Sequence, residues 1–169
     1  IQYKTVELFA LSITAKTKIK GLLEIITAAY EFGNLAIRQK EEKLLKKMAS
    51  HLPQALPAES NFEEPSTKAL LLLQAHFSRL ALSSNLTQDL NWILKNSTKL
   101  IQAIVDVISS QGWLRPAIAA MELSQMIVQG LWDKDSPLKQ VPHFSDAVIE
   151  QCQRMEPAIE SVFDFLELE

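Results

Sequence analysis

The fold is decided by residues 86–113, LTQDLNWILKNSTKLIQAIVDVISSQGW, which we predict to form one long helix. Apolar side chains recur in this stretch three and four positions apart, which is the spacing of a helix that buries one side. Gly112 supplies the expected end of the helix, because glycine readily adopts the left-handed conformation found at helix ends. The predicted buried stripe consists of Leu90, Ile93, Leu94, Ser97, Leu100, Ile101, Ile104, Val105 and Ile108.

The opposite face of this predicted helix collects polar side chains and one aromatic ring. Its members are Trp92, Lys95, Asn96, Lys99, Gln102 and Asp106. Such a line would suit a nucleic-acid strand, with lysines on phosphates and Trp92 beneath a base. The alternative is an ordinary solvated face that happens to hold a tryptophan, because Asp89 and Asp106 balance its two lysines. The residues alone leave both interpretations open.

Length and composition favour one helical domain with a sizeable core. The chain has 169 residues, 47% of them hydrophobic, and only 4 glycines, which argues against a hairpin-rich β fold. The formal net charge is −3, so no strong overall field draws the chain to nucleic acid or acidic lipid. Charge is uneven: residues 1–50 hold nine Lys and Arg against five Asp and Glu (+4), and residues 51–169 hold eight against fifteen (−7).

The chain begins with Ile1 rather than methionine, which favours a piece of a larger protein. Its longest all-apolar run, residues 69–73, stops at Gln74 and is far too short to span a membrane. The single cysteine, Cys152, excludes an internal disulfide and suits a reducing compartment.

Start and stop signals divide the remaining chain into further helices. We predict helices over residues 6–13, 19–30, 39–50 and 67–82, the last capped by Ser66, with a proline-containing loop over residues 51–65. Beyond the long helix we predict one with Pro116 in its first turn that runs to about residue 132, then helices near 145–154 and 157–166. The fold class is therefore all-α, a bundle of roughly seven helices.

Motifs that carry chemistry are missing from the sequence. It contains no glycine-rich phosphate loop and no acidic box that could hold magnesium for nucleotide hydrolysis. His51, His76 and His143 lack the spacing of metal ligands, and Cys152 has no cationic neighbour except Arg154. We therefore predict no catalytic residue, no metal site and no cofactor in this chain.

Three polar residues, His76, Ser78 and Arg79, project from a helix whose other residues are almost all apolar. A cation in such surroundings must pair, reach solvent or face a channel. Arg79 is therefore interpreted either as the ion-pair partner of a carboxylate on an adjacent helix or, with His76 and Ser78, as part of a channel lining.

Several tracts resemble one known family along essentially the whole chain. They are residues 71–79 (LLLQAHFSR), 112–117 (GWLRPA), 121–123 (MEL), 132 (W), 134–136 (KDS), 138–140 (LKQ) and 142–144 (PHF), with 7–9 (ELF), 17–18 (TK), 21–22 (GL) and 160–164 (ESVFD) near the ends. These tracts resemble the Sec sixty-three homology unit of large Ski-two-like RNA helicases. Within that family the chain is most similar to the spliceosomal DExH-box members, and there to the unit of the second, C-terminal cassette.

The resemblance implies a domain organisation and a set of neighbours. Residues 1–143 would form the helical bundle of the unit, and residues 144–169 the beginning of a helix-loop-helix domain. Each cassette of such a helicase has two RecA-like domains, a winged helix, the bundle, the helix-loop-helix and an immunoglobulin-like domain. The bundle of the family contains a ratchet helix that lies across the nucleic-acid channel, and residues 86–113 match it.

One departure from the family bears on function. The active, N-terminal cassette carries two arginines three apart on the ratchet helix, where this chain has Lys99 and Gln102. Lysine holds a phosphate as a point charge without the planar two-pronged grip of arginine, and glutamine brings no charge. The difference fits what the resemblance implies for the second cassette, a degenerate motor that serves as a protein-docking platform and intramolecular regulator.

Two functions remain open at this point, with a third more distant. The first is a nuclear, non-catalytic docking and regulatory module that binds splicing factors and the other domains of the helicase. The second is a ratchet module that contacts single-stranded RNA during translocation, which the thin basic line through Lys95 and Lys99 would make weak. A translocon-type relative without a motor is the third, and the lack of a membrane segment gives it no support.

Overall fold

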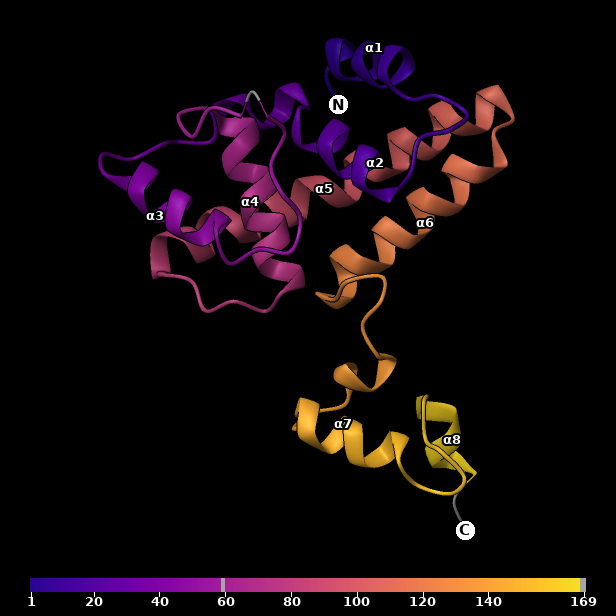
Figure 1. Ribbon diagram of the computed structural model, residues 1–169. Coiled ribbons are helices and arrows are strands. Elements are labelled where there is room, and N and C mark those ends of the chain that lie inside the picture. Colours follow the sequence, from indigo (N-terminus) through magenta and orange to yellow (C-terminus); the bar gives the residue numbers. More distant parts are fainter. Residues whose placement is uncertain (59, 168–169) are drawn as a thin grey trace. The chain divides into compact units, whose positions relative to one another are not determined.

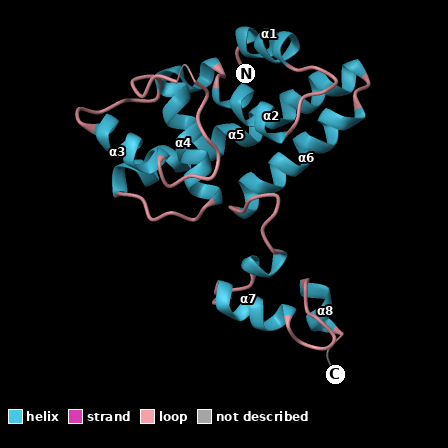
Figure 2. Cartoon of the chain, viewed as in Figure 1, coloured by secondary structure: helices cyan, strands magenta, loops and turns pink. Residues whose placement is uncertain are grey.

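The computed structural model describes residues 1–58 and 60–167, and every regular element in them is helical (Figures 1 and 2). The α-helices of these residues are α1 (Tyr3–Ser12), α2 (Ile19–Thr27), α3 (Glu41–Ala49), α4 (Pro65–Phe77), α5 (Ser84–Gln111), α6 (Leu114–Gln129), α7 (Asp146–Gln153) and α8 (Val162–Leu166). Two short 3₁₀ helices accompany them, η1 (Tyr30–Asn34) and η2 (Pro137–Gln140). The predicted all-α class is confirmed.

The chain divides into two compact units, Ile1–Gly130 and Leu131–Glu169. In the first unit, α4 and α5 are central. Helix α5 packs against α1, α4 and α6, while α4 also packs against α2, α3 and η1 (Figure 1). None of the described helices is both long and apolar enough to cross a membrane.

The core of the first unit follows the predicted apolar pattern. Helix α4 is buried on all sides from Thr67 to Ala75, as its run of leucines predicts. Most of the predicted stripe of α5 is buried as well, with Leu94 and Val105 half-buried at its edges. These two helices therefore form the apolar centre against which the others fold.

The boundaries of α4 differ from the prediction at both ends. The helix begins at Pro65 with Glu64 as its N-cap residue, so the assignment of the cap to Ser66 is wrong. Proline suits this first position because its fixed φ is already helical and its missing N–H has no partner there in any case. The helix ends at Phe77 rather than residue 82, because Arg79 adopts a left-handed conformation with φ 51°.

Helices α2 and α6 end earlier than predicted. Helix α2 ends at Thr27, whose hydroxyl donates to the carbonyls of Leu23 and Glu24, and the chain turns extended at Ala29. Helix α6 ends at Gln129 because Gly130 takes the left-handed conformation, with φ 62°.

The second unit has its own small core, formed by Leu138, Ile149, Cys152 and Ile159. Helix α7 starts after Ser145, whose hydroxyl accepts a hydrogen bond from the Val148 amide. Helix α8 starts after Ser161, later than predicted, because Ser161 and Asp164 form a reciprocal capping box that fixes the first turn.

Candidate interaction face on the long helix

The aromatic member of the predicted channel face is held by the bundle. Trp92 is 39% exposed, and its ring meets the buried ring of Phe32 edge-on, with the centroids 5.9 Å apart. This is a favoured geometry for two aromatic rings. Part of the Trp92 surface therefore remains open to solvent, while its orientation is set by η1.

The polar members of the face divide into engaged and free groups. The Asn96 side chain donates to the Trp92 carbonyl at 2.8 Å, and Gln102 donates to Asp106 at 3.2 Å. Lys95 and Lys99 are exposed, and within residues 1–58 and 60–167 neither forms an ion pair. The face runs about 15 Å from Trp92 to Gln102 at the rise of an α-helix. Its positive charge consists of two ammonium groups, and the exposed Asp106 carboxylate, which the neutral Gln102 amide does not neutralise, opposes them.

The second predicted cluster, His76, Ser78 and Arg79, lies at the end of α4, and two of its side chains contact the C-terminal end of α6. A ring nitrogen of His76 is 2.9 Å from the Ile127 carbonyl, and Arg79 Nε donates to the Gly130 carbonyl at 3.2 Å. Ser78 is the C-cap residue of α4. The Arg79 guanidinium suits this position because the last carbonyls of a helix carry partial negative charge. The part that these residues play in a channel stays a prediction.

An ion network inside the first unit was missed by the sequence analysis. Lys68 of α4 is 0% exposed, and its Nζ donates to Ala36 O, Glu41 Oε2 and Asp89 Oδ2, each at 2.7 Å. Arg38 completes the network with Asp89, at 2.5 and 3.0 Å, and with Glu41, at 3.0 Å. Two cations therefore face two carboxylates, and every charge has a partner.

The network shifts the acidity of its carboxylates. Burial alone would raise the pKa of Asp89, but hydrogen bonds from Arg38 and Lys68 outweigh burial and hold that pKa below its usual value. Burial likewise opposes ionisation of Glu41, and the bonds from Lys68 and Arg38 again bring its pKa below the usual range. The network ties α3 and α4 to Asp89, one turn before Trp92 on α5.

One signal for this network was present in the sequence. Lys68 precedes the apolar run at residues 69–73 on a helix that is buried all round, and a cation there must find an acidic partner. The sequence does not identify the partners, because Arg38 and Glu41 lie on a separate segment and the apolar pattern of the long helix places Asp89 with its solvated side.

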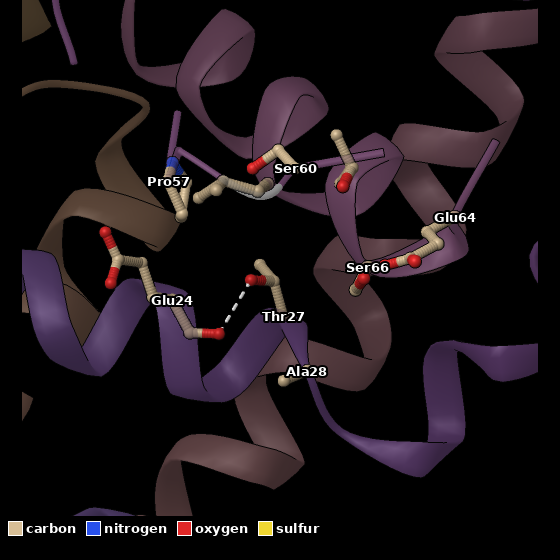
Figure 3. Close-up of a pocket in the computed structure, with 9 residues that line it drawn as sticks. Glu24, Thr27, Ala28, Pro57, Ser60, Glu64 and Ser66 are labelled. Atoms are coloured by element: carbon tan, nitrogen blue, oxygen red, sulfur yellow. Dashed lines mark hydrogen bonds between the residues drawn. The ribbon is translucent and has the colours of Figure 1, made fainter. Parts of the chain in front are cut away.

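A pocket of about 210 Å³ lies between α2 and the start of α4 (Figure 3). Glu24 and Glu64 flank it, with the hydroxyls of Thr27, Ser60 and Ser66 on its walls. No lysine or arginine lines it among the described residues. A phosphate would meet two carboxylates, so the pocket does not favour a nucleotide.

The described part of the chain also lacks any group of three or more His, Cys, Asp or Glu side chains that could hold a metal ion. Its distinctive feature is instead a helical bundle around one long helix with a buried side and a solvent-facing side. The chain belongs to the Sec63 Brl domain family, whose model matches residues 1–166, and the resemblance found in the sequence is confirmed.

Relatives at about half identity include ribonucleoprotein helicases and a pre-mRNA-splicing factor. The chain is 51% identical over 173 residues to a U5 small nuclear ribonucleoprotein 200 kDa helicase of Drosophila melanogaster. It is 50% identical over 169 residues to the human protein of the same name, and 47% to the pre-mRNA-splicing factor brr2 of Schizosaccharomyces pombe. Each match covers 100% of this chain, which spans only 8% of the length of these relatives.

Proposed function

We propose that this chain is an accessory domain of a nuclear, spliceosomal ATP-dependent RNA helicase and acts there as a docking and regulatory scaffold. The relatives support the setting, because splicing helicases match the chain from end to end. The observation that carries the scaffold role is the α5 face, where Gln102 is bound to Asp106 and only two lysines remain free. So little free charge gives a weak grip on an RNA backbone.

The place of the domain in the helicase follows from the same residues. Lys99 and Gln102 stand where the active cassette of the family has arginines, which favours the second, C-terminal cassette. Its partners are then the winged helix, the RecA-like domains and the helix-loop-helix of the same polypeptide, together with splicing-factor proteins. Residues 144–169 are proposed to begin that helix-loop-helix.

A ratchet that touches RNA directly is the second candidate. Lys95 and Lys99 are exposed and unpaired among the described residues, and Trp92 keeps part of its ring open. One aromatic ring and two cations in line can hold a short single strand by stacking and phosphate contacts.

Unwinding by the parent helicase separates the two candidates. The double substitution Lys95→Ala/Lys99→Ala removes the positive charge of the α5 face without touching the core. The scaffold role predicts that the rate of unwinding of paired small nuclear RNA stays within about twofold of wild type, whereas loss of two phosphate contacts would cost a ratchet about tenfold or more. A loss of that size would reject the scaffold as the main role.

A further inference from the structure

A second hollow of the first unit lies between α3 and the connection from α4 to α5. Its volume is about 380 Å³. Leu44 is 49% exposed and Leu80 is also exposed, whereas Leu86 is buried. The hollow is thus an apolar groove that is open to solvent. Its floor is formed by Leu44, Met48, Leu80, Leu82 and Leu86.

Basic side chains border this groove along α3. Lys47 of α3 lines it, as does His51 in the turn after the helix, and Lys43 lies one helical turn before Lys47 on the same side of α3. All three are exposed. The groove therefore has an apolar floor and a basic rim.

The acidic residues of α3 do not neutralise this rim. Glu41 belongs to the buried network with Lys68, and Glu42 binds Lys46 at 2.5 Å. Lys43 and Lys47 form no ion pair with any residue that the structure describes. The charge of the rim is thus available to a partner of opposite sign.

We infer that this groove docks an acidic amphipathic segment of a partner protein, with apolar side chains on the leucine floor and carboxylates against Lys43 and Lys47. The inference rests on the proposed docking role of the domain. Helices that lay an apolar stripe into such a groove are a common mode of peptide recognition, and methionine on the floor adapts to different side chains. An RNA strand would also meet the lysines, but the described lining offers its bases no Phe, Tyr or Trp ring and only the imidazole of His51.

Peptide selection tests the chemistry of the partner without assuming its sequence. Random displayed peptides of about twelve residues, long enough for three helical turns, are selected on the 169-residue chain. The expected winners combine Asp or Glu with Leu, Ile or Phe three and four positions apart. Failure to select any peptide, or winners without acidic residues, would overturn the inference.

Matched variants then locate the binding. The affinity of a selected peptide is measured by fluorescence anisotropy for the wild type, for Lys43→Glu/Lys47→Glu and for Lys16→Glu/Lys18→Glu, which changes the net charge equally on exposed lysines outside the groove. We expect the first double variant to weaken binding by about tenfold or more and the second by less than about twofold. Equal weakening would mean attraction by net charge alone and would reject the groove.

Two further measurements separate the remaining explanations. One is competition by oligouridine, and the other is the separate test of the scaffold role. Oligouridine that binds more tightly than the peptide and is lost in Lys43→Glu/Lys47→Glu would make the groove a nucleic-acid site and overturn the inference. Binding of the selected peptide that is unchanged in Lys43→Glu/Lys47→Glu would reject the groove as its site but leave the scaffold role intact. Failure of the scaffold role appears separately, as loss of unwinding in Lys95→Ala/Lys99→Ala.

Discussion

At the residue scale, the strongest constraint in the first unit is a single buried ammonium group. Lys68 joins Glu41 of α3 to Asp89 of α5 and has no exposed surface. A buried charge of this kind contributes little net stability over an apolar replacement of the whole network, but removal of one partner leaves the others uncompensated. The contribution of the network to stability is therefore measured best by removing the charge of one of its residues.

Lys68→Met should lower the free energy of unfolding by about 3 kcal/mol, near the low end for a broken buried pair, because half-buried Arg38 still holds both carboxylates. Urea denaturation measures the loss. The control is Lys46→Met, which removes an exposed pair with Glu42 and should cost less than about 1 kcal/mol. Equal losses for the two variants would contradict the burial of the network.

The same network predicts how stability depends on pH. The pKa values of Glu41 and Asp89 are lower in the folded state than in the unfolded chain, so their contribution is fully present above their unfolded values of about 4. It is lost as pH falls through the folded values. Unfolding of the wild type between about pH 6 and pH 3 should therefore show a steeper loss of stability than Lys68→Met. Parallel curves would show that the network does not depress these pKa values.

At the element scale, the helix positions that could be predicted were those set by a long apolar pattern. The two faces of α5 and the all-round burial of α4 follow from spacing alone. The ends of α2 and α4 could not be placed as well, because each depends on local conformation, whereas Gly130 is the same kind of stop signal for α6 as Gly112 is for α5. Helix α4 begins at Pro65 and not after Ser66. The left-handed conformation that follows its end is adopted by Arg79, and arginine, unlike glycine, does not indicate such a conformation in a sequence.

Leu72→Ala tests the central position of α4. Leu72 is 0% exposed, so truncation should cost about 2–5 kcal/mol through lost burial and the cavity that remains. Thermal and urea unfolding measure the change. Leu11→Ala, at an exposed leucine of α1, is the control and should stay within about 0.5 kcal/mol of wild type. A Leu72→Ala melting point equal to that of the wild type would show that the helix is misplaced.

At the scale of the whole molecule, the family could be predicted from sequence but the groove beside α3 could not. The matching tracts run from residue 7 to residue 164, and the family is confirmed over residues 1–166. The groove beside α3 escaped the sequence analysis because its floor joins Leu44 to Leu80 and Leu86, which lie far apart in sequence. The face of α5 was visible in the pattern, and its role stays a prediction.

The isolated chain should neither bind nor hydrolyse ATP. The sequence has no phosphate loop or acidic box, and the pocket between α2 and α4 presents carboxylates where a nucleotide would need cations (Figure 3). Phosphate release and calorimetric titration check the two parts of the prediction. Turnover above background that survives repeated purification would contradict it.

The scaffold role leads to a definite expectation for RNA. The isolated chain should bind single-stranded RNA no more tightly than the non-specific range of about 10⁻⁴–10⁻⁶ M at physiological salt. Lys99→Ala should weaken that binding without changing sequence preference, because a phosphate contact carries no base information.

Gln102→Arg should strengthen RNA binding and steepen its salt dependence by nearly one unit, since one more phosphate is neutralised. Gln125→Arg, at an exposed glutamine of α6, controls for added charge.

The most direct test is fluorescence anisotropy of a labelled single-stranded RNA with the wild-type chain at two salt concentrations. The scaffold role predicts a dissociation constant in the micromolar range or weaker at physiological salt, with a shallow salt dependence set by at most two lysines of α5. Nanomolar affinity at physiological salt, lost in Lys95→Ala/Lys99→Ala, would contradict the scaffold role and establish α5 as an RNA-gripping helix.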